Sequence, residues 1–310
     1  MITSGNALSQ ILTTDIGVKQ LQDPKDFVGL RLFPLFKTPH ISGSYWLIND
    51  GAMVDATPSL ARSPGAPFGR SQTKLAGDQY WAEIYGHEED LGQEDLEKYA
   101  SPRAAQEAVA RRVHRVLLLG HELRVKALAT SAPVSSAAVA IPWTNPVSDP
   151  LSDVAVVRQA IFVACAREPN VMTVPRTAFE TLKAHPSIKA LVKISTADAR
   201  WPDLLAGVFD VERFAVARGT VNAANEGQPI SLTEIWEDSV MLAYVDQTED
   251  LRAPSFGRTF IVTDEDNPFG VKIEAFANDP NKALMVRASQ ITAEKLTALK
   301  CGYRLYGMLS

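Results

Sequence analysis

The stretch at residues 168–191, EPNVMTVPRTAFETLKAHPSIKAL, predicts a strand that leads directly into a helix. Val171–Val174 is a β-prone run, and the segment after Pro175 has an apolar face with helical spacing. We expect this helix to end at His185-Pro186, because the residue before a proline is disfavoured in a helix. A strand, turn and helix often build an active site, yet this turn has no glycine cradle, no nucleophile and no metal ligand. The unit is well formed but carries no recognisable chemistry.

The composition is that of a folded protein of ordinary polarity. The chain has 310 residues, of which 46% are hydrophobic and 22% charged, enough for two or three folded modules. Its formal net charge of −5 argues against a dedicated nucleic-acid binder. The sequence opens without a secretory-signal pattern, and its apolar runs are far shorter than the roughly 20 residues that cross a bilayer. We therefore expect no membrane span.

Two cysteines, Cys165 and Cys301, stand among apolar or small neighbours. This number is too small for a disulfide framework and suits a reducing cytosol. We expect both to be buried and to pack as small apolar residues.

Two segments rich in aromatic and β-branched residues, SGSYWLIND and DQYWAEIYG, predict strands on either side of a long connection. The connection holds Pro58, Pro64 and Pro67 and is too long for a tight hairpin turn. An isolated hairpin is only marginally stable in water. We therefore expect residues 41–86 to form an extended two-stranded arm that rests on another body, and residues 1–40 to form an irregular arm.

Two helices have clear start signals. Ser101-Pro102 supplies a cap and a first-turn proline for a helix to about Thr130, roughly 28 residues and about 42 Å long. Asp149-Pro150 opens another. Strands are expected in FDVERFAVARGTVNAA and EIWEDSVMLAYVD, and a hairpin is expected around Asp264–Gly270. The tail alternates as a strand through Val286 and again near Tyr303–Tyr306.

The residues that bear chemistry do not form a recognisable catalytic or metal site. His114 and His121 on the first long helix are about 10 Å apart along its axis, too far for one metal ion. Together with Glu122 they are interpreted as solvated or interface residues. The acidic turn after Asp264 lacks the glycine and glutamate positions of a calcium loop. We expect no catalytic residue, no metal and no cofactor, and hence no enzyme.

The charge pattern is more informative. Residues 83–97 carry only acidic charges, whereas the following helix and the long connection carry an excess of basic ones. These charges are either solvated faces or complementary surfaces of neighbouring copies, with a basic loop tip on an acidic patch. The second interpretation predicts a subunit interface that includes Arg62, Arg70, Lys74, Glu88, Glu89, Asp90, Glu94 and Asp95.

The order of these parts resembles the major capsid proteins of tailed phages, namely the lambda-type coat proteins with the Hong Kong 97-like fold. The resemblance is carried by ARSPGAP in the long connection, SDPLSDVAVVRQAI at the second helix, the opening stretch, LAGVFDVERFAVARGTVNAA, IWEDSVMLAYV and APSFGRTF. Each motif alone is loose, but their order and spacing over about residues 40–260 are specific.

The resemblance implies an α+β fold in five segments. These are an N-terminal arm (1–40), an extended hairpin loop (41–86), a peripheral domain with a long spine helix (87–167), an axial domain (168–255) and a return to the peripheral domain (256–310). The strand–helix unit of the opening stretch would then pack the axial domain rather than perform a reaction.

The implied function is that of a major capsid protein, which assembles as hexamers and pentamers into an icosahedral head shell around phage DNA. Implied partners are further copies of the chain, separate scaffolding and portal proteins, decoration proteins, and packaged double-stranded DNA contacted without sequence readout. The implied location is the virion, after assembly in the host cytoplasm. A covalent cross-link through Lys74 is not carried over, because the sequence identifies no partner residue.

Two other interpretations stay open at this point. An encapsulin-like nanocompartment shell shares the fold and encloses cargo enzymes instead of DNA. A soluble α/β enzyme with an unrecognised site belongs to a different functional class, and a bound ligand in a pocket of a monomer or dimer would favour it.

Overall fold

The computed structural model describes residues 26–48, 64, 76–92, 94, 98–99, 101–192, 200–265, 267–278 and 283–309. Most of the predicted N-terminal arm and of the long connection lies outside these residues. So do four of the predicted interface residues, which are Arg62, Arg70, Lys74 and Asp95.

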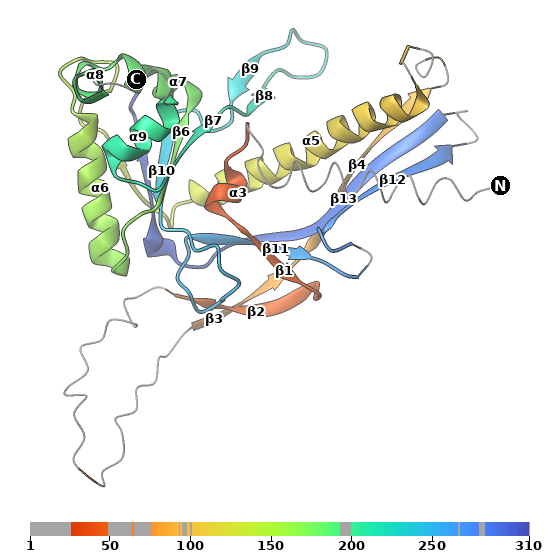
Figure 1. Cartoon of the computed structure of the whole chain (residues 1–310), viewed down its shortest axis with the longest axis horizontal. Helices are drawn as coiled ribbons and strands as arrows, with labels where there is room; N and C mark the ends of the chain where they lie inside the picture. The colour runs from red at the N-terminus through yellow and green to blue at the C-terminus, as the bar shows by residue number, and fades with distance from the viewer. Residues whose placement is uncertain are drawn as a thin grey trace.

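Two five-stranded sheets form the body. In the first, the order is β1 (Leu35–Thr38), β11 (Gly257–Val262), β13 (Ala283–Leu296) and β12 (Val271–Asn278), with β4 (Glu83–Gly92) also paired to β13. In the second, the order is β5 (Ser135–Ala138), β14 (Gly302–Tyr306), β10 (Ser239–Ala243), β6 (Val171–Pro175) and β7 (Arg213–Ala217). The sheets occupy different ends of the molecule (Figure 1).

The opening stretch folds as predicted. β6 is buried along its whole length and leads directly into α7 (Arg176–Ala184), which ends at His185 before α8 (Pro186–Val192) begins. Apolar side chains of α6 (Pro150–Cys165), α7, α8 and α9 (Trp201–Phe209) share one core with the second sheet. That sheet also takes in β5 and β14 from outside residues 168–255, and the predicted division into segments stays a prediction.

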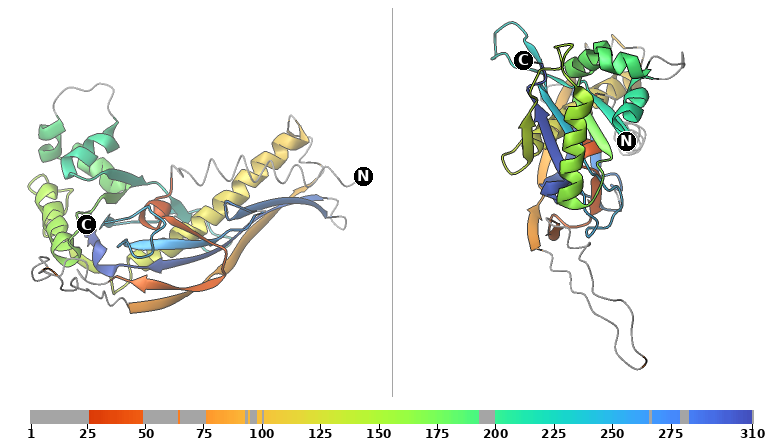
Figure 2. Two further views of the ribbon diagram at one scale, coloured as in Figure 1. Left: turned by 60° about the horizontal axis from the view of Figure 1, so that its bottom comes forward. Right: turned by 90° about the vertical axis from the view of Figure 1, so that its left-hand side faces the viewer.

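The long helix also matches its prediction. α5 spans Pro102–Ala129, and the hydroxyl of Ser101 accepts a hydrogen bond from the Ala104 N–H at 3.2 Å. Figure 2 shows α5 lying along one face of the first sheet. Val109 and Val113 pack there against Ile273 and Val286. α6 likewise begins at the predicted place, with the carboxylate of Asp149 as its cap.

The first predicted strand of the long hairpin pairs only with the first part of the second. The second predicted strand breaks at Ala82, and from Glu83 on its residues belong to β4 of the first sheet. β2 (Ser42–Leu47) and β3 (Ala76–Trp81) are antiparallel, with Ser42 opposite Trp81. Their base rests on the first sheet, because the ring of Tyr80 stacks on Phe260 of β11 at 4.2 Å. A second small hairpin joins β8 (Thr220–Asn222) to β9 (Leu232–Glu234).

The predicted hairpin around Asp264–Gly270 is wrong. β11 pairs with the end of β13 and β12 pairs with its beginning, both antiparallel to it and along the same edge. The chain therefore makes an excursion at residues 263–270 and then continues in its original direction. The polar residues and Gly270, with φ +74°, correctly signal a turn. A turn signal alone does not fix which strands pair.

The interpretation of His114, His121 and Glu122 as solvated or interface residues is also wrong, because all three side chains are buried. Glu122 accepts hydrogen bonds from the N–H groups of Val28 and Gly29 at 3.0 and 2.6 Å. These lie at the start of α3 (Gly29–Leu32). The indole N–H of Trp236 donates to the same carboxylate at 2.5 Å. Burial raises the pKa of Glu122, and the three donors oppose that rise.

A second polar contact fixes α5 to β13. Arg124 donates two hydrogen bonds to Glu294, both at 2.9 Å, and its guanidinium lies 3.6 Å from the centre of the Tyr85 ring. His121 contacts the Thr259 hydroxyl at 2.9 Å. Burial alone would raise the pKa of Glu294, but Arg124 and His121 hold it below its usual value.

Candidate subunit-contact surfaces

The strand β4 divides the predicted acidic patch between two faces. Successive side chains of a strand point to opposite sides. Glu89 faces α5, where Arg112 donates to it at 3.2 Å through Nε and also through Nη2. Glu88 faces the other way and pairs at 2.7 Å with Arg287, which lies opposite it on β13. The structure does not bring these two acids together, and both already have a basic partner.

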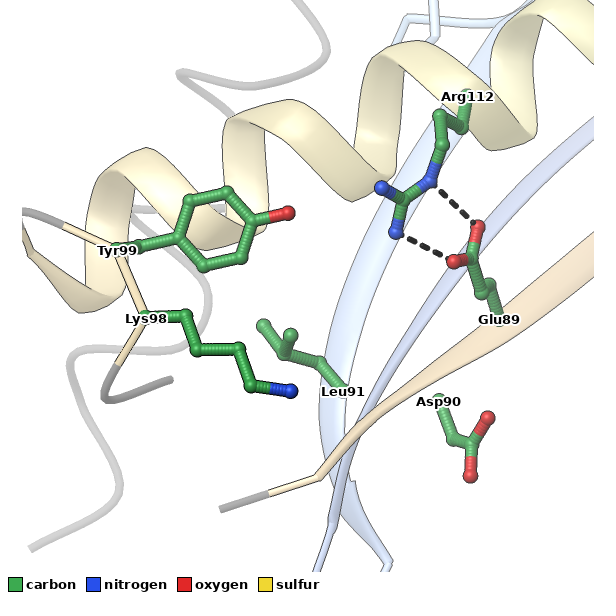
Figure 3. Close-up of a pocket in the computed structure, with 6 residues that line it drawn as sticks. All are labelled: Glu89, Asp90, Leu91, Lys98, Tyr99 and Arg112. Atoms are coloured by element: carbon green, nitrogen blue, oxygen red, sulfur yellow. Dashed lines mark hydrogen bonds and ion pairs between the residues drawn. The ribbon is translucent and has the colours of Figure 1, made fainter. Parts of the chain in front are cut away.

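A surface pocket of about 280 Å³ lies between the end of β4 and the start of α5. Its lining residues are Glu89, Asp90, Leu91, Lys98, Tyr99 and Arg112. Figure 3 shows Glu89 turned toward Arg112, whereas Asp90 points away from it. The hydrogen bond to Glu89 raises the pKa of Arg112. Of the predicted acids within the described residues, Glu88, Asp90 and Glu94 are exposed and Glu89 is half-buried.

Three further surfaces expose large apolar side chains. At the hairpin base, Trp81 of β3 and Ile84 of β4 are strongly exposed, Ile84 at 75%. On the β8–β9 hairpin, Ile230 and Leu232 are exposed at 77% and 67%. A two-stranded hairpin of this kind has little stability of its own. Single exposed apolar residues are ordinary, but clusters at the edges of elements mark interaction sites.

The third apolar surface is the outer face of α6. Val156, Ala160 and Val163 are separated by four and three residues, which places them on one side of the helix. Val156 and Val163 are exposed at 66% and 74%. The opposite side of the same helix is buried in the core. A helix that is apolar on both sides is normally covered on both sides.

A serine–histidine pair does occur, but in a structural setting. The Ser148 hydroxyl lies 3.2 Å from Nε2 of His185 and donates to the Asn145 carbonyl at 2.8 Å. Both side chains are buried, and a nucleophile has to be reached by its substrate. Within the described residues there is no group of three or more His, Cys, Asp or Glu placed to hold a metal ion. The described helices include none that is long and apolar enough to cross a membrane.

No protein-family model matches the sequence. Over 166 residues the chain is 30% identical to the major capsid protein of Burkholderia phage BcepMu. That match covers 52% of this chain and 51% of the relative, so the chain spans about half the length of the curated relative it matches.

Solved structures match over nearly the whole chain. A phage-related protein from Bordetella bronchiseptica RB50 is 23% identical, with a TM-score of 0.73 and coverage of 96% of both chains. A virus-like particle from Pyrococcus furiosus is 11% identical, with a TM-score of 0.59 and coverage of 98% and 100%. The capsid of cyanophage P-SCSP1u is 11% identical, with a TM-score of 0.54 and coverage of 90% and 87%. At these identities the matches show the fold, and the predicted phage-capsid fold is confirmed.

Proposed function

We propose, from the Hong Kong 97-like fold that this chain shares with phage capsid proteins, that it is a major capsid protein of a tailed phage. It assembles as hexamers and pentamers into an icosahedral head shell around phage DNA. One observation carries the proposal: a partial sequence match to a phage major capsid protein coincides with a fold match over 96% of the chain.

The distribution of exposed apolar groups supports this function. They lie on three separate elements, the hairpin base, α6 and the β8–β9 hairpin. A subunit of a closed shell contacts several neighbours at once, through different surfaces. Each contact is modest on its own, and the closed particle is stable because the contacts are many. A monomeric enzyme has no comparable use for three such surfaces.

The proposed partners follow from the same function. The chain binds further copies of itself, with separate scaffolding, portal and decoration proteins in the assembling head, and the shell confines double-stranded DNA without reading its sequence. A net charge of −5 suits confinement better than tight DNA binding. The protein is a component of the virion that assembles in the host cytoplasm. Its role is structural, in accord with its capsid relative.

Electron microscopy of the purified full chain tests the function directly. We expect closed polyhedral shells, with sedimentation far faster than that of a free subunit. A monomer or dimer under all assembly conditions, with a small molecule bound in a pocket, would instead favour the enzyme interpretation.

Charge on the α6 surface should block assembly. The double variant Val156→Glu/Val163→Glu places two carboxylates in an interface that we propose is apolar, where an unpaired charge is strongly unfavourable. We expect soluble, folded subunits and no shells, measured by circular dichroism and sedimentation. The matched control, Val156→Thr/Val163→Thr, keeps the side-chain shape without charge and should still assemble. Normal shells from the glutamate variant would remove α6 from the interface.

We propose a charged contact between neighbouring subunits that includes fewer acidic residues than the interface predicted from the sequence. Because Glu88 and Glu89 are paired within the subunit, the acids available to a neighbour's Arg62, Arg70 and Lys74 are Asp90, Glu94 and Asp95. Reversing the three basic residues to Glu should lower shell yield, most strongly at low salt. A matched set, Arg62→Lys, Arg70→Lys and Lys74→Arg, keeps the charge and should assemble normally. Equal yields from both sets would rule out this docking.

A nanocompartment shell is the second candidate, favoured by the fold match to the virus-like particle from Pyrococcus furiosus. Its support is weaker, since that match is 11% identical and shows the fold alone, whereas the sequence match is to a phage protein. The contents of particles purified from the native source separate the two. Packaged double-stranded DNA supports the phage head, and a protein cargo supports the compartment.

A further inference from the structure

Cys165 and Cys301 lie side by side although they are 136 positions apart in the sequence. Cys165 is the last residue of α6, and Cys301 is the last residue of the short helical turn η3 (Leu299–Cys301). The two elements contact each other. Both cysteines are free thiols, and Cys165 packs against the apolar cluster that contains Cys301.

The pair sits at the junction of the two sheets. The chain leaves β13 of the first sheet, passes through η3 and enters β14 of the second. Cys165 packs against two core clusters at once, the one below α6 and the one that contains Cys301, Phe256 and Val125. A covalent bond at this point would tie α6 to the connection between the sheets.

The two thiols differ in reactivity and in access. Cys301 is 1% exposed, whereas Cys165 is partly exposed at the helix end. The neighbouring Cys301 thiol lowers the pKa of Cys165, and the charge of Arg167 adds to this effect. The neighbouring Cys165 thiol, together with burial, raises the pKa of Cys301. Cys165 is therefore the thiol that forms a thiolate more readily and that a small reagent reaches first.

We propose that Cys165 and Cys301 form an intrachain disulfide by exchange with a low-molecular-weight disulfide such as glutathione disulfide. The Cys165 thiolate attacks one sulfur of glutathione disulfide, forming a mixed disulfide and releasing one glutathione thiolate, which takes up a proton. Cys301 then loses its proton and attacks the Cys165 sulfur, releasing the second glutathione. Two cysteine thiols are oxidised, and one glutathione disulfide is reduced to two glutathione molecules. The proposal does not depend on the capsid function.

The bond should stabilise the subunit, because it closes a long loop and so reduces the freedom of the unfolded chain. For a protein of this size we expect the melting temperature to rise by roughly 5–15 °C after oxidation. Reduction with dithiothreitol should reverse the change.

The test uses the full-length chain with glutathione disulfide as the probe, at neutral pH. Free thiols are counted by maleimide labelling after denaturation, and a non-reducing protease digest is searched for the peptide that links Cys165 to Cys301. We expect the count to fall from two thiols per chain to none, with the linked peptide present and the chain monomeric on a non-reducing gel. The variants Cys165→Ser and Cys301→Ser should each add one glutathione or remain free, without the gain in melting temperature.

Three results would overturn the proposal. These are two thiols that stay free in folded wild-type protein, a stable mixed disulfide at Cys165 that Cys301 never resolves, and a disulfide between two chains. The wild-type digest decides between them even if a serine variant fails to fold.

Discussion

The two longest helices each cover a five-stranded sheet, but they do so with different chemistry. α6 buries only apolar residues against the second sheet, among them Val154, Val157 and Ile161. α5 buries His114, His121 and Glu122 as well as apolar residues such as Val109 and Val113. Apolar packing is non-directional and tolerates small shifts, whereas a buried polar group is satisfied in one geometry only. We infer from this contrast that α6 stabilises the fold by burying apolar surface, and that α5 in addition fixes the position of the segments it contacts.

The polar groups of α5 connect segments that are distant in the sequence. Glu122 holds the start of α3 and the indole of Trp236, and Arg124 holds Glu294 of β13. Removing one partner of such a contact leaves the other buried and unpaired. The comparison therefore predicts that truncations on the polar side of α5 cost more stability than truncations of similar size on α6.

The largest effect is expected for Glu122→Ala. It leaves three buried N–H donors without their acceptor, at about 1–3 kcal/mol each, so we expect the free energy of unfolding to fall by roughly 4–6 kcal/mol. Guanidinium denaturation of unassembled subunits at pH 7 measures this loss. Glu122→Gln keeps one acceptor oxygen and should lie between the wild type and the alanine variant. A loss below 2 kcal/mol for Glu122→Ala would break the proposed contrast between the helices.

A smaller loss is expected on the apolar side, for Ile161→Ala in α6. Ile161 is 1% exposed and packs within the core of the second sheet. Deleting three carbons there creates a cavity and should cost about 3 kcal/mol, and the matched Ile161→Val change about 1 kcal/mol. The same denaturation assay applies. If Ile161→Ala lowers the free energy of unfolding more than Glu122→Ala does, apolar packing contributes more to stability than the buried polar contacts at both helices.

The buried histidines give the third prediction, a dependence of stability on pH. Burial lowers the pKa of His114 from 6.5 to about 4. The unfolded chain then binds a proton between these values that the folded chain does not bind. The contribution of His114 is therefore complete above pH 6.5 and is lost as the pH falls toward 4, by up to about 3 kcal/mol at 1.36 kcal/mol per pKa unit.

Replacing His114 by Met removes this titration. The free energy of unfolding of His114→Met, measured from pH 7.5 to 4, should fall less steeply than that of the wild type. His121 remains in both proteins, and burial also lowers its pKa to about 4, so the difference between the two curves isolates His114. Parallel curves would mean that folding does not change the pKa of His114.

Local signals in the sequence are sufficient to predict where a helix begins, because a cap or a proline acts on the backbone of its immediate neighbours. Ser101-Pro102 and Asp149-Pro150 fixed the starts of α5 and α6, because capping and proline geometry need only neighbouring residues. Local signals do not predict the excursion at residues 263–270, for the converse reason. Pairing of β11 and β12 with β13 depends on partners elsewhere in the chain.

The candidate surfaces show the same limit. A run of acids predicts a charged strand, but alternation sends Glu88 and Glu89 to opposite faces. The two-residue alternation of side chains predicts this separation of Glu88 and Glu89 as soon as the segment is identified as a strand. The burial of Glu122 could not be predicted in this way, since its three hydrogen-bond donors come from residues 28, 29 and 236. A charged residue flanked by apolar positions on a helix is the one weak signal that pointed there.

The smallest effect is expected where a polar pair is exposed rather than buried. Glu89 and Arg112 lie at the surface, with about a third and a half of their side chains exposed. Water and salt screen such a pair, so Glu89→Gln should lower the free energy of unfolding by less than about 1 kcal/mol. Added salt should remove most of that difference in the same denaturation assay. A cost comparable to that of Glu122→Ala would mean that the polar contacts of α5 stabilise the fold through their charge rather than through their burial.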